Sequence, residues 1–571
     1  MKKIAIIGVG PRGLSALESF IKHLSNQNKK AAITLFETAE NPGAGEIWNI
    51  DQPNTNWLNI SERDLKELPN RPKIKYDNII LPEFETYHKW ACVNLDTKTP
   101  DVFPARNKIG SYFKERFSSL AVPLIAVKKI ELQKTKIINV SKNKNYFTLT
   151  DQSLNKYQFD EVLLTIGHQP TEDSDQLKKW THYSKEEPSV LLVKDAYPIK
   201  KYLNSKLISS ENNIAIRGMG LSMIDILRAL TIQKGGHFEI INPSTYQSIF
   251  KSGKNTPKKI IPFSLDGKLA VPKPLNINID NLFKPSEEEF KEFSKSLIEV
   301  TSGNVEAKDT HFFKNAIAKI SSGIFIKLPS KVKTDNYSIE QIHDTIINWL
   351  TDEDFQHPLL AKNKKDPKKT IQSYINMAIN IAPMSLDYCV GQVWRHCHSV
   401  MYNAFSHAKI EEDVLYLAIA LYDRMKRYSY GPPVESMQQI IALINADILV
   451  LDYINNPEIK LSSEGWILSK HEKSITARVM INSVLNSPKL LKVNSPIIKG
   501  LLSDELISPF HSKLGIETDK NASVITEEDK KIKSLAVLGR LAKGSVLGVD
   551  SISACFGERV EKWAEETAKR L

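Results

Sequence analysis

A glycine-rich turn near the start of the chain constrains its fold more than any other feature. Residues 3–7 (KIAII) form a short apolar run rich in β-branched side chains, which predicts a buried strand. The run leads directly into Gly8-Val9-Gly10-Pro11-Arg12-Gly13, and residues 14–21 follow with helical spacing. Residues 32–36 predict a second strand, which ends at Glu37. This order of strand, glycine turn, helix, strand and acid predicts a Rossmann-type unit.

The residue types in this turn suit a dinucleotide. Gly8 permits the tight turn, Gly10 lets a pyrophosphate approach the backbone, and Gly13 lets the helix pack closely on the strand. The N-terminus of the helix directs free N–H groups and a positive dipole end at the phosphates. Glu37 lies near the spacing of a carboxylate that accepts hydrogen bonds from ribose hydroxyls. We expect cofactor contacts from Gly8, Gly10, Pro11, Arg12, Gly13 and Glu37. The alternative is a glycine-rich turn in an α/β domain without a nucleotide.

Three further segments carry a resemblance to known flavoproteins. Residues 41–48 (NPGAGEIW) resemble the part of flavin-containing monooxygenases in which a glycine-rich turn and an aromatic residue approach the flavin. Residues 103–112 (FPARNKIGSY) look like the FPxR…GxY segment of a bacterial FAD/NAD(P)-binding family. Described members of that family include FAD-dependent urate hydroxylase and nitrosuccinate-forming amino-acid N-monooxygenases. Residues 159–170 resemble the strand that closes the FAD domain, with a Gly-His after it.

This resemblance implies FAD as the cofactor. Trp48, Arg106 and Gly167 occupy the matching positions and are expected to lie beside it. His168 follows Gly167, and a loop position beside the cofactor, with no proton to move, is favoured over a catalytic role.

A second glycine turn predicts another dinucleotide-binding fold. Residues 213–217 predict a strand, Gly218-Met219-Gly220-Leu221-Ser222 follows, and residues 236–241 predict the next strand. The Gly-x-Gly-Leu-Ser-x-x-Asp form again resembles the same family, and cofactor contacts are expected from Gly218, Gly220 and Ser222. Met223 stands at the third glycine position, so helix and strand pack less closely.

The identity of the second cofactor is less constrained by the residues. No acid ends the strand over residues 236–241, which weakens the case for NADH and favours NADPH, with Lys251 or Lys254 as partners of its 2′-phosphate. The alternative is a relic fold that binds no nicotinamide.

The rest of the chain changes character after residue 285. Ser286 is a good N-cap before three acids, and helical periodicity dominates residues 338–350, 370–381, 386–405 and 434–448. Arg395 could pair with an anionic substrate or tie two helices together. His396 and His398, two residues apart on a helix, point in different directions and cannot share one metal ion. Near the end of the chain, Gly548 could bring backbone N–H groups to the flavin ring.

The predicted fold class is therefore α/β, with two Rossmann-type dinucleotide-binding folds and a mostly α-helical C-terminal region. The expected boundaries are an FAD-binding domain over residues 1–200, completed by 530–571, a second dinucleotide-binding domain over 201–280, and a mainly helical substrate region over 281–529.

Composition narrows the classes of function. The net charge of +11 is compatible with nucleic-acid binding. The lysines are spread widely, however, and the densest cluster, 362–369, is interrupted by Asn363, Asp366 and Pro367. No nucleic-acid partner is therefore expected. No apolar stretch is long enough to span a membrane and the N-terminal run is too short for a signal peptide, so a cytoplasmic location is expected. The four cysteines contain no Cys-x-x-Cys pair, which argues against a disulfide reductase.

Oxygen then becomes the favoured acceptor of electrons from the flavin. The preferred hypothesis is an FAD-dependent, NAD(P)H-dependent monooxygenase that hydroxylates a small molecule through a flavin hydroperoxide. The alternatives are a flavin reductase or dehydrogenase without oxygen insertion, and a flavin-binding protein without catalysis. The sequence identifies no catalytic residue, substrate or oligomeric state.

Overall fold

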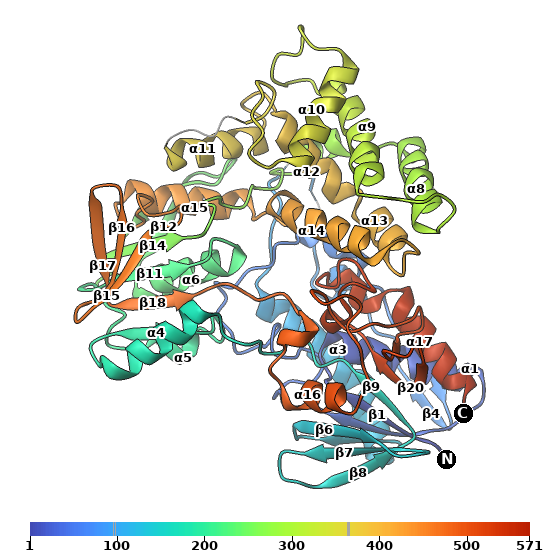
Figure 1. Ribbon diagram of the computed structural model, residues 1–571. Helices are drawn as coiled ribbons and strands as arrows, with labels where there is room; N and C mark the ends of the chain where they lie inside the picture. Colours follow the sequence, from blue (N-terminus) through green and yellow to red (C-terminus); the bar gives the residue numbers. More distant parts are fainter. Residues whose placement is uncertain (95, 98, 362–365) are drawn as a thin grey trace.

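The computed structural model describes residues 1–94, 96–97, 99–361 and 366–571. The lysines at 362, 364 and 365, which belong to the densest cluster of the sequence, lie outside the described residues. Three parts are visible in Figure 1: a sheet that carries both chain termini, a second sheet beside it, and a layer of helices above them. The mixed α/β architecture agrees with the predicted fold class.

The first sheet has the strand order β19-β20-β9-β1-β2-β5. In chain order its strands are β1 (Lys3–Ile7), β2 (Ala32–Phe36), β5 (Ile130–Gln133), β9 (Glu161–Leu164), β19 (Ser523–Ile525) and β20 (Lys531–Val537). β1, β2, β5, β9 and β20 run parallel to their neighbours, whereas β19 pairs antiparallel with β20. The strand β20, more than 350 residues after β9, thus completes the sheet that the N-terminus begins.

Helices cover this sheet where its strands are apolar. The helices α1 (Pro11–Asn26), α3 (Arg106–Ala126) and α17 (Glu558–Lys569) form the largest cover, with short elements α2 (Tyr87–Trp90), β3 (Ile74–Tyr76) and β4 (Ile79–Leu81) beside them. Pro11 starts α1 because its missing N–H has no partner in the first turn of a helix. α17 packs along α1, and the Lys2 ammonium donates to the Arg570 carbonyl at 2.7 Å, so the two ends of the chain lie together (Figure 1). A meander of β6 (Ile137–Lys142), β7 (Phe147–Asp151) and β8 (Lys156–Phe159) packs with α16 (Pro496–Ser503) on the opposite side.

The second sheet departs from the expected βαβ unit. Its order is β10-β18-β11-β14, all parallel, with β10 (Leu191–Val193), β11 (Asn213–Arg217), β14 (Lys259–Phe263) and β18 (Val479–Asn482). The strand predicted over 236–241 exists as β12 (His237–Asn242), but it pairs antiparallel with β13 (Gln247–Lys251) in a separate hairpin. The parallel neighbour of β11 after helix α6 (Leu221–Thr231) is therefore β14, because the hairpin is inserted between them.

The second sheet also reaches beyond the range 201–280. β10 precedes that range, and β18 comes from the region expected to be mainly helical. That region also contributes a three-stranded meander to the described structure: β15 (Glu458–Ser462), β16 (Gly465–Lys470) and β17 (Lys473–Ala477). The meander covers one face of the second sheet together with α4 (Asp175–Glu186). The expected boundaries therefore cut through one folded unit, since the apolar core that holds this sheet runs through all these segments.

The helical layer follows the predicted periodicity closely. It contains α8 (Glu287–Thr301), α9 (His311–Lys327), α10 (Ile339–Thr351), α11 (Pro367–Ala378), α12 (Leu386–His396), α13 (His398–Phe405), α14 (Glu412–Ser429) and α15 (Val434–Asn445). The short α7 (Ile277–Asp280) precedes α8 in the chain, whereas the short α5 (Lys200–Leu203) lies beside α4 at the second sheet (Figure 1). Ser286 caps α8 in a capping box with Glu289. The single helix expected over 386–405 is broken at Cys397, which separates α12 from α13. Among the described helices, none combines the length and the apolar character that crossing a bilayer requires.

Candidate functional site

The first glycine turn has the geometry that a phosphate cradle needs. Gly8 has φ of +91°, and a Cβ there would lie 2.7 Å from the Thr165 carbonyl oxygen at the end of β9. A Cβ on Gly13 would lie 2.2 Å from the Gly8 carbonyl oxygen, so only glycine lets α1 approach β1 this closely. No described side chain caps α1 at Gly10, and its first turn carries no acid. The N–H groups at the start of α1 are therefore directed at whatever anion lies in the turn.

Glu37 ties this turn to the end of β2. Its carboxylate accepts hydrogen bonds from the backbone N–H groups of Val9 at 2.5 Å, Thr38 at 2.7 Å and Ala39 at 2.8 Å. A carboxylate has about four acceptor positions, so these contacts leave room for one ribose hydroxyl. Glu37 thus holds the two edges of the cradle in register, and its contact with a ribose remains a prediction.

The segment after β2 folds over the turn. The Gly43 N–H donates to the Val9 carbonyl at 2.6 Å, and a Cβ on Gly45 would lie 3.1 Å from the Gly10 Cα. Trp48 packs its ring edge-on against Phe113 of α3, with centroids 6.3 Å apart. The structure therefore shows Trp48 against α3, while its place beside a flavin stays a prediction.

The C-terminal segment closes the same region from the other side. After β20, a Cβ on Gly539 would lie 2.8 Å from a guanidinium nitrogen of Arg12, and the Arg12 Nη2 donates to the Val549 carbonyl at 3.2 Å. Gly548, with φ of +63°, lies against His398, since a Cβ there would be 2.7 Å from His398 Cε1. The His398 Nδ1 in turn lies 2.8 Å from the Tyr422 hydroxyl. Gly548 therefore joins the first sheet to α13 and α14.

Gly167 and His168 follow β9 after two intervening residues, and their place beside the cofactor stays a prediction. Gly167 has φ of +65°, which explains the glycine, and both residues are exposed. His396, by contrast, contacts Asp280, so the two histidines around Cys397 face different partners. None of the described residues forms a group of three or more His, Cys, Asp or Glu side chains arranged to hold a metal ion.

The second glycine turn is more open than the first. Gly218 has φ of +110°, and a Cβ there would lie 2.6 Å from the Ser483 hydroxyl, which donates to the Arg217 carbonyl at 3.0 Å. A Cβ on Gly220 would meet no described atom within 4 Å. Helix α6 starts at Gly220 without a side-chain cap among the described residues, so an anion could approach its N-terminus.

The expected 2′-phosphate partners lie at the wrong edge of this sheet. The Lys258 N–H donates to the Asn212 carbonyl, and these two residues immediately precede the parallel strands β14 and β11. The chain therefore enters β14 from the amino edge of the sheet, and Lys254, four residues before Lys258, lies at that edge. Lys251 pairs across the hairpin with His237, near the C-terminal end of α6, and its ammonium contacts Glu239 at 2.5 Å. Gly218 and Gly220 lie at the carboxyl edge, about 16 Å away by the rise of a five-residue strand. The prediction that Lys251 or Lys254 contacts a 2′-phosphate at this turn is therefore wrong.

Arg106 pairs with a carboxylate of the second glycine turn's helix, and its place beside the flavin stays a prediction. Its guanidinium contacts the Asp225 carboxylate of α6 at 2.7 Å, donates to the Trp57 carbonyl at 3.2 Å and lies over the Tyr197 ring. Burial disfavours the charged guanidinium, but Asp225 and Tyr197 together outweigh burial and raise the pKa of Arg106 above its ordinary value. The Tyr197 hydroxyl donates to the same carboxylate at 2.5 Å. Arg106 therefore links the first domain to the second glycine turn.

Sequence reasoning missed the centre of this contact. Asp225 is part of the Gly-x-Gly-Leu-Ser-x-x-Asp form, yet nothing in the spacing assigned it a role. A buried carboxylate requires a cationic partner, and the arginine of the FPxR segment was the available candidate. The signal was therefore present in two motifs that lie more than 100 residues apart.

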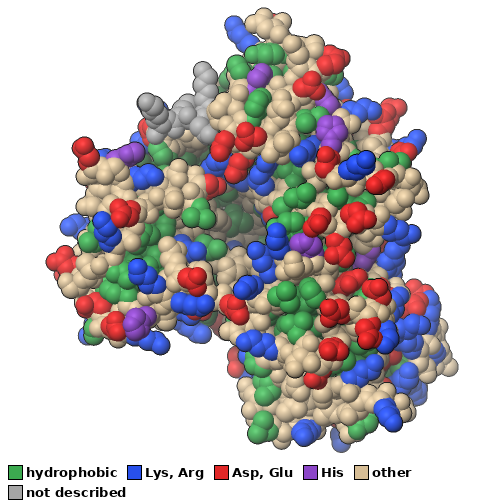
Figure 2. Space-filling model, in the orientation of Figure 1, with side chains coloured by type: hydrophobic (Ala, Val, Ile, Leu, Met, Phe, Trp, Pro, Cys, Tyr) green, Lys and Arg blue, Asp and Glu red, His purple; other side chains and the backbone are tan. Residues whose placement is uncertain are grey.

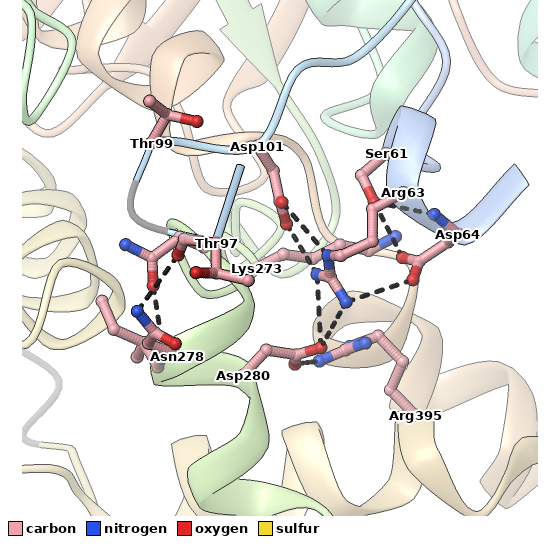
Figure 3. A network of polar contacts seen from close by, with 12 residues as sticks. Ser61, Arg63, Asp64, Thr97, Thr99, Asp101, Lys273, Asn278, Asp280 and Arg395 are labelled. Atoms are coloured by element: carbon pink, nitrogen blue, oxygen red, sulfur yellow. Dashed lines mark hydrogen bonds and ion pairs between the residues drawn. The ribbon is translucent and has the colours of Figure 1, made fainter. Parts of the chain in front are cut away.

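A second ionic network joins the first domain to the helical layer (Figure 3). Arg63 contacts Asp101 at 2.7 Å and Asp280 at 3.3 Å, and Asp280 also pairs with Arg395 of α12. Burial alone would raise the pKa of Asp280. Arg395 and His396 together lower it by more than burial raises it, so the pKa lies well below its ordinary value and the carboxylate stays ionised. The Lys273 ammonium donates to the Asn59 carbonyl, and burial together with Arg395 lowers the pKa of Lys273 to about 8.

This network decides between the two roles considered for Arg395. Its guanidinium is bound by Asp280 and by the Gln392 side-chain oxygen, so in this structure it ties α12 to α7. Figure 2 shows a hollow on the face where the two sheets and the helical layer meet, with Lys and Arg side chains along its edge.

Fold and site together define the class of this protein: two α/β folds with glycine turns at the carboxyl edges of parallel strands, joined beneath a helical layer. Residues 5–169 match the model of a protein family described as FAD-NAD(P)-binding. Over these residues the resemblance inferred from the motifs is confirmed, whereas the resemblance to urate hydroxylase stays a prediction.

Two curated relatives are similar over part of the chain. Nitrosuccinic acid synthase from Aspergillus oryzae is 24% identical over 241 residues, which cover 41% of this chain and 36% of the relative. L-Aspartate N-monooxygenase (nitrosuccinate-forming) from Streptomyces cremeus is 22% identical over 270 residues, which cover 41% of this chain and 38% of the relative. The match therefore spans less than two fifths of the length of these relatives. Among solved structures, cyclohexanone monooxygenase from Rhodococcus sp. Phi1 aligns with a TM-score of 0.45 at 8% identity, over 100% of this chain and 85% of its own.

Proposed function

We propose that this protein is an FAD-dependent, NAD(P)H-dependent monooxygenase that acts on a small molecule. The observation that carries the proposal is the first glycine turn, where Gly8, Gly13 and the uncapped start of α1 form a cradle inside the segment that matches the FAD-NAD(P)-binding family. When bound there, FAD supplies hydride acceptance and the activation of oxygen.

The residues of the chain would hold and orient the cofactor. The N–H groups at the start of α1 would bind the pyrophosphate, and Glu37 would accept a ribose hydroxyl with its remaining capacity. Arg12 is the second residue of α1, whereas Gly167 and Gly548 lie on the loops that follow β9 and β20. The second turn at Gly218, Gly220 and Ser222 would bind the pyrophosphate of NAD(P)H, and the preference for NADPH stays a prediction.

The names of the two relatives support a proposal for the substrate class. Both named relatives act in nitrosuccinate formation, and one is named an L-aspartate N-monooxygenase. We propose the amino nitrogen of a small amino acid as the site of hydroxylation, with molecular oxygen as co-substrate. A cytoplasmic location stays a prediction from the sequence.

A second candidate is a flavin-binding protein that takes no electrons from a nicotinamide. The hairpin β12–β13, which leaves the second sheet without the strand expected next to β11, favours this candidate. It predicts a yellow protein that neither NADPH nor NADH reduces.

The decisive experiment begins with the absorbance spectrum of the purified protein. Bands near roughly 370 and 450 nm, as for any oxidised flavin, should bleach when NADPH is added without oxygen. Oxygen uptake with L-aspartate and other amino acids, together with identification of a hydroxylated product, then tests the monooxygenase activity. A colourless protein after reconstitution with FAD contradicts the whole proposal. A yellow protein that is inert to both nucleotides leaves only the second candidate, and oxygen uptake that yields peroxide alone indicates an oxidoreductase without oxygen insertion.

A further inference from the structure

Asp225 lies where a negative charge should weaken anion binding at the second glycine turn. It is the fifth residue of α6, about 6 Å along the helix axis from the first residue by the helical rise. Its side chain is 3% exposed, so solvent does little to screen it. A phosphate at the N-terminus of α6 would therefore feel the charge of Asp225 unless another group balances it.

The balancing group comes from the other domain. Arg106, the first residue of α3, reaches Asp225 Oδ2 at 2.7 Å, and the Trp57 N–H and the Tyr197 hydroxyl add neutral hydrogen bonds to the same carboxylate. Arg228 lies farther away, with Nη1 at 3.8 Å from Asp225 Oδ1. Its guanidinium also feels Glu435, stacks on the Trp57 ring at 3.7 Å and donates to Gln439.

The charges around Asp225 sum to zero only when Arg106 is present. Asp225 and Glu435 supply two negative charges, and Arg106 and Arg228 supply two positive charges. Without Arg106 this buried group would carry a net negative charge beside the start of α6, which opposes an anion.

We propose that Arg106 is a positioning residue for the nicotinamide cofactor: by neutralising Asp225, the FAD-binding domain makes the second glycine turn able to bind a pyrophosphate. The inference rests on the proposed function, because it assumes that this turn takes a nicotinamide dinucleotide. It assigns the arginine of the FPxR segment to the second cofactor through Asp225, and it makes that site dependent on the docking of the two domains.

Charge neutralisation predicts an unusual pattern among three variants. Arg106→Gln leaves the charge of Asp225 exposed to the ligand, so NADP⁺ should bind about 7- to 50-fold more weakly, as a unit charge about 7 Å away implies at an effective dielectric constant of about 20 to 40. Arg106→Gln combined with Asp225→Asn removes both charges and should recover affinity to within about threefold. Asp225→Asn alone should bind NADP⁺ as tightly as the wild type or more tightly.

The measurement is the dissociation constant of NADP⁺ with the FAD-loaded protein by isothermal titration calorimetry, with flavin content and unfolding temperature recorded for each variant. Arg63→Gln is the matched control, because Arg63 also joins the first domain to another part of the chain but contacts Asp101 and Asp280 instead of α6 (Figure 3). It should leave NADP⁺ affinity within about threefold of the wild type.

Three results would overturn the inference. One is wild-type affinity in Arg106→Gln, another is weakened binding in Asp225→Asn, and the third is an equal loss in Arg63→Gln, which would indicate domain docking alone. A wild-type protein that holds FAD but binds neither NADP⁺ nor NAD⁺ would refute the nicotinamide part of the proposed function together with this inference. Normal NADP⁺ binding by the wild type with an unaffected Arg106→Gln variant would refute the inference alone.

Discussion

Substitution of Gly13 by alanine tests the first phosphate cradle most directly. The added Cβ would lie 2.2 Å from the Gly8 carbonyl oxygen and 3.0 Å from the Thr165 hydroxyl, whereas ordinary contacts begin at 3.4 Å. The oxygen belongs to the backbone and cannot rotate away, so α1 must move outward from β1 by about 1 Å. Overpacking of this kind costs about 1–3 kcal/mol. Because the same N–H groups would hold the pyrophosphate, we expect FAD to bind about 5- to 150-fold more weakly.

The assay is titration of the apoprotein with FAD, followed by quenching of flavin fluorescence, with the unfolding temperature measured in parallel. Gly323→Ala is the matched control, because a Cβ at this position in α9 meets no described atom within 4 Å. Alanine there should stabilise the protein by up to about 1 kcal/mol through helix propensity and leave FAD affinity unchanged. If Gly13→Ala binds FAD within twofold of the wild type and keeps the same unfolding temperature, the close approach of α1 and β1 is not what forms the cradle.

Three further predictions concern stability, pH and the second turn. Glu18 accepts hydrogen bonds from the buried guanidinium groups of Arg71 and Arg116. Glu18→Ala should therefore lower the free energy of unfolding in urea by about 3–5 kcal/mol. Glu40→Ala, which removes an exposed acid, should change that free energy little. Burial, and then Lys426, lowers the pKa of His398 to about 4, so the unfolded chain takes up this proton first. The free energy of unfolding should fall as the pH drops from 6.5 to about 4 and level off below, with a shallower fall in His398→Gln; an identical slope in both proteins would contradict this. Gly220→Ala places a methyl group in open space, where the pyrophosphate would approach the backbone, so it should weaken NADP⁺ binding without lowering the unfolding temperature. Unchanged affinity would show that no phosphate approaches Gly220.

The sequence was sufficient for the elements whose determinants are local. β1, the turn at Gly8 and α1 follow from one stretch of chain, because strand, turn and helix each depend on neighbouring residues. The start of α8 was predictable for the same reason, since Ser286 and Glu289 form its capping box within four residues. The break between α12 and α13 was not, because Cys397 lies among residues that favour helix and carries no proline or glycine signal.

Strand pairing was beyond the reach of local patterns. β12 has the composition of a strand, but whether it joins β11 or folds back on β13 depends on competition between distant segments. β14 takes the place next to β11, and β18, from more than 200 residues later, takes the other side. The error in placing Lys251 and Lys254 follows from this, since assigning β12 to the sheet puts the turns around it at the wrong edge.

Glycines outside the first cradle allow segments of the chain to pack closely. A Cβ on Gly110 would lie 1.8 Å from the Trp48 carbonyl oxygen, and one on Gly391 would lie 2.4 Å from the Tyr428 Cβ. A Cβ on Gly431 would lie 1.8 Å from the Val271 carbonyl oxygen. These glycines let α3 approach the segment after β2, α12 approach α14, and the turn after α14 approach the segment after β14. Close packing of this kind fixes how these segments of the chain lie against one another. Glycine has no side chain with which to select a substrate, so a resemblance carried by glycine turns identifies a fold and a cofactor more readily than a substrate.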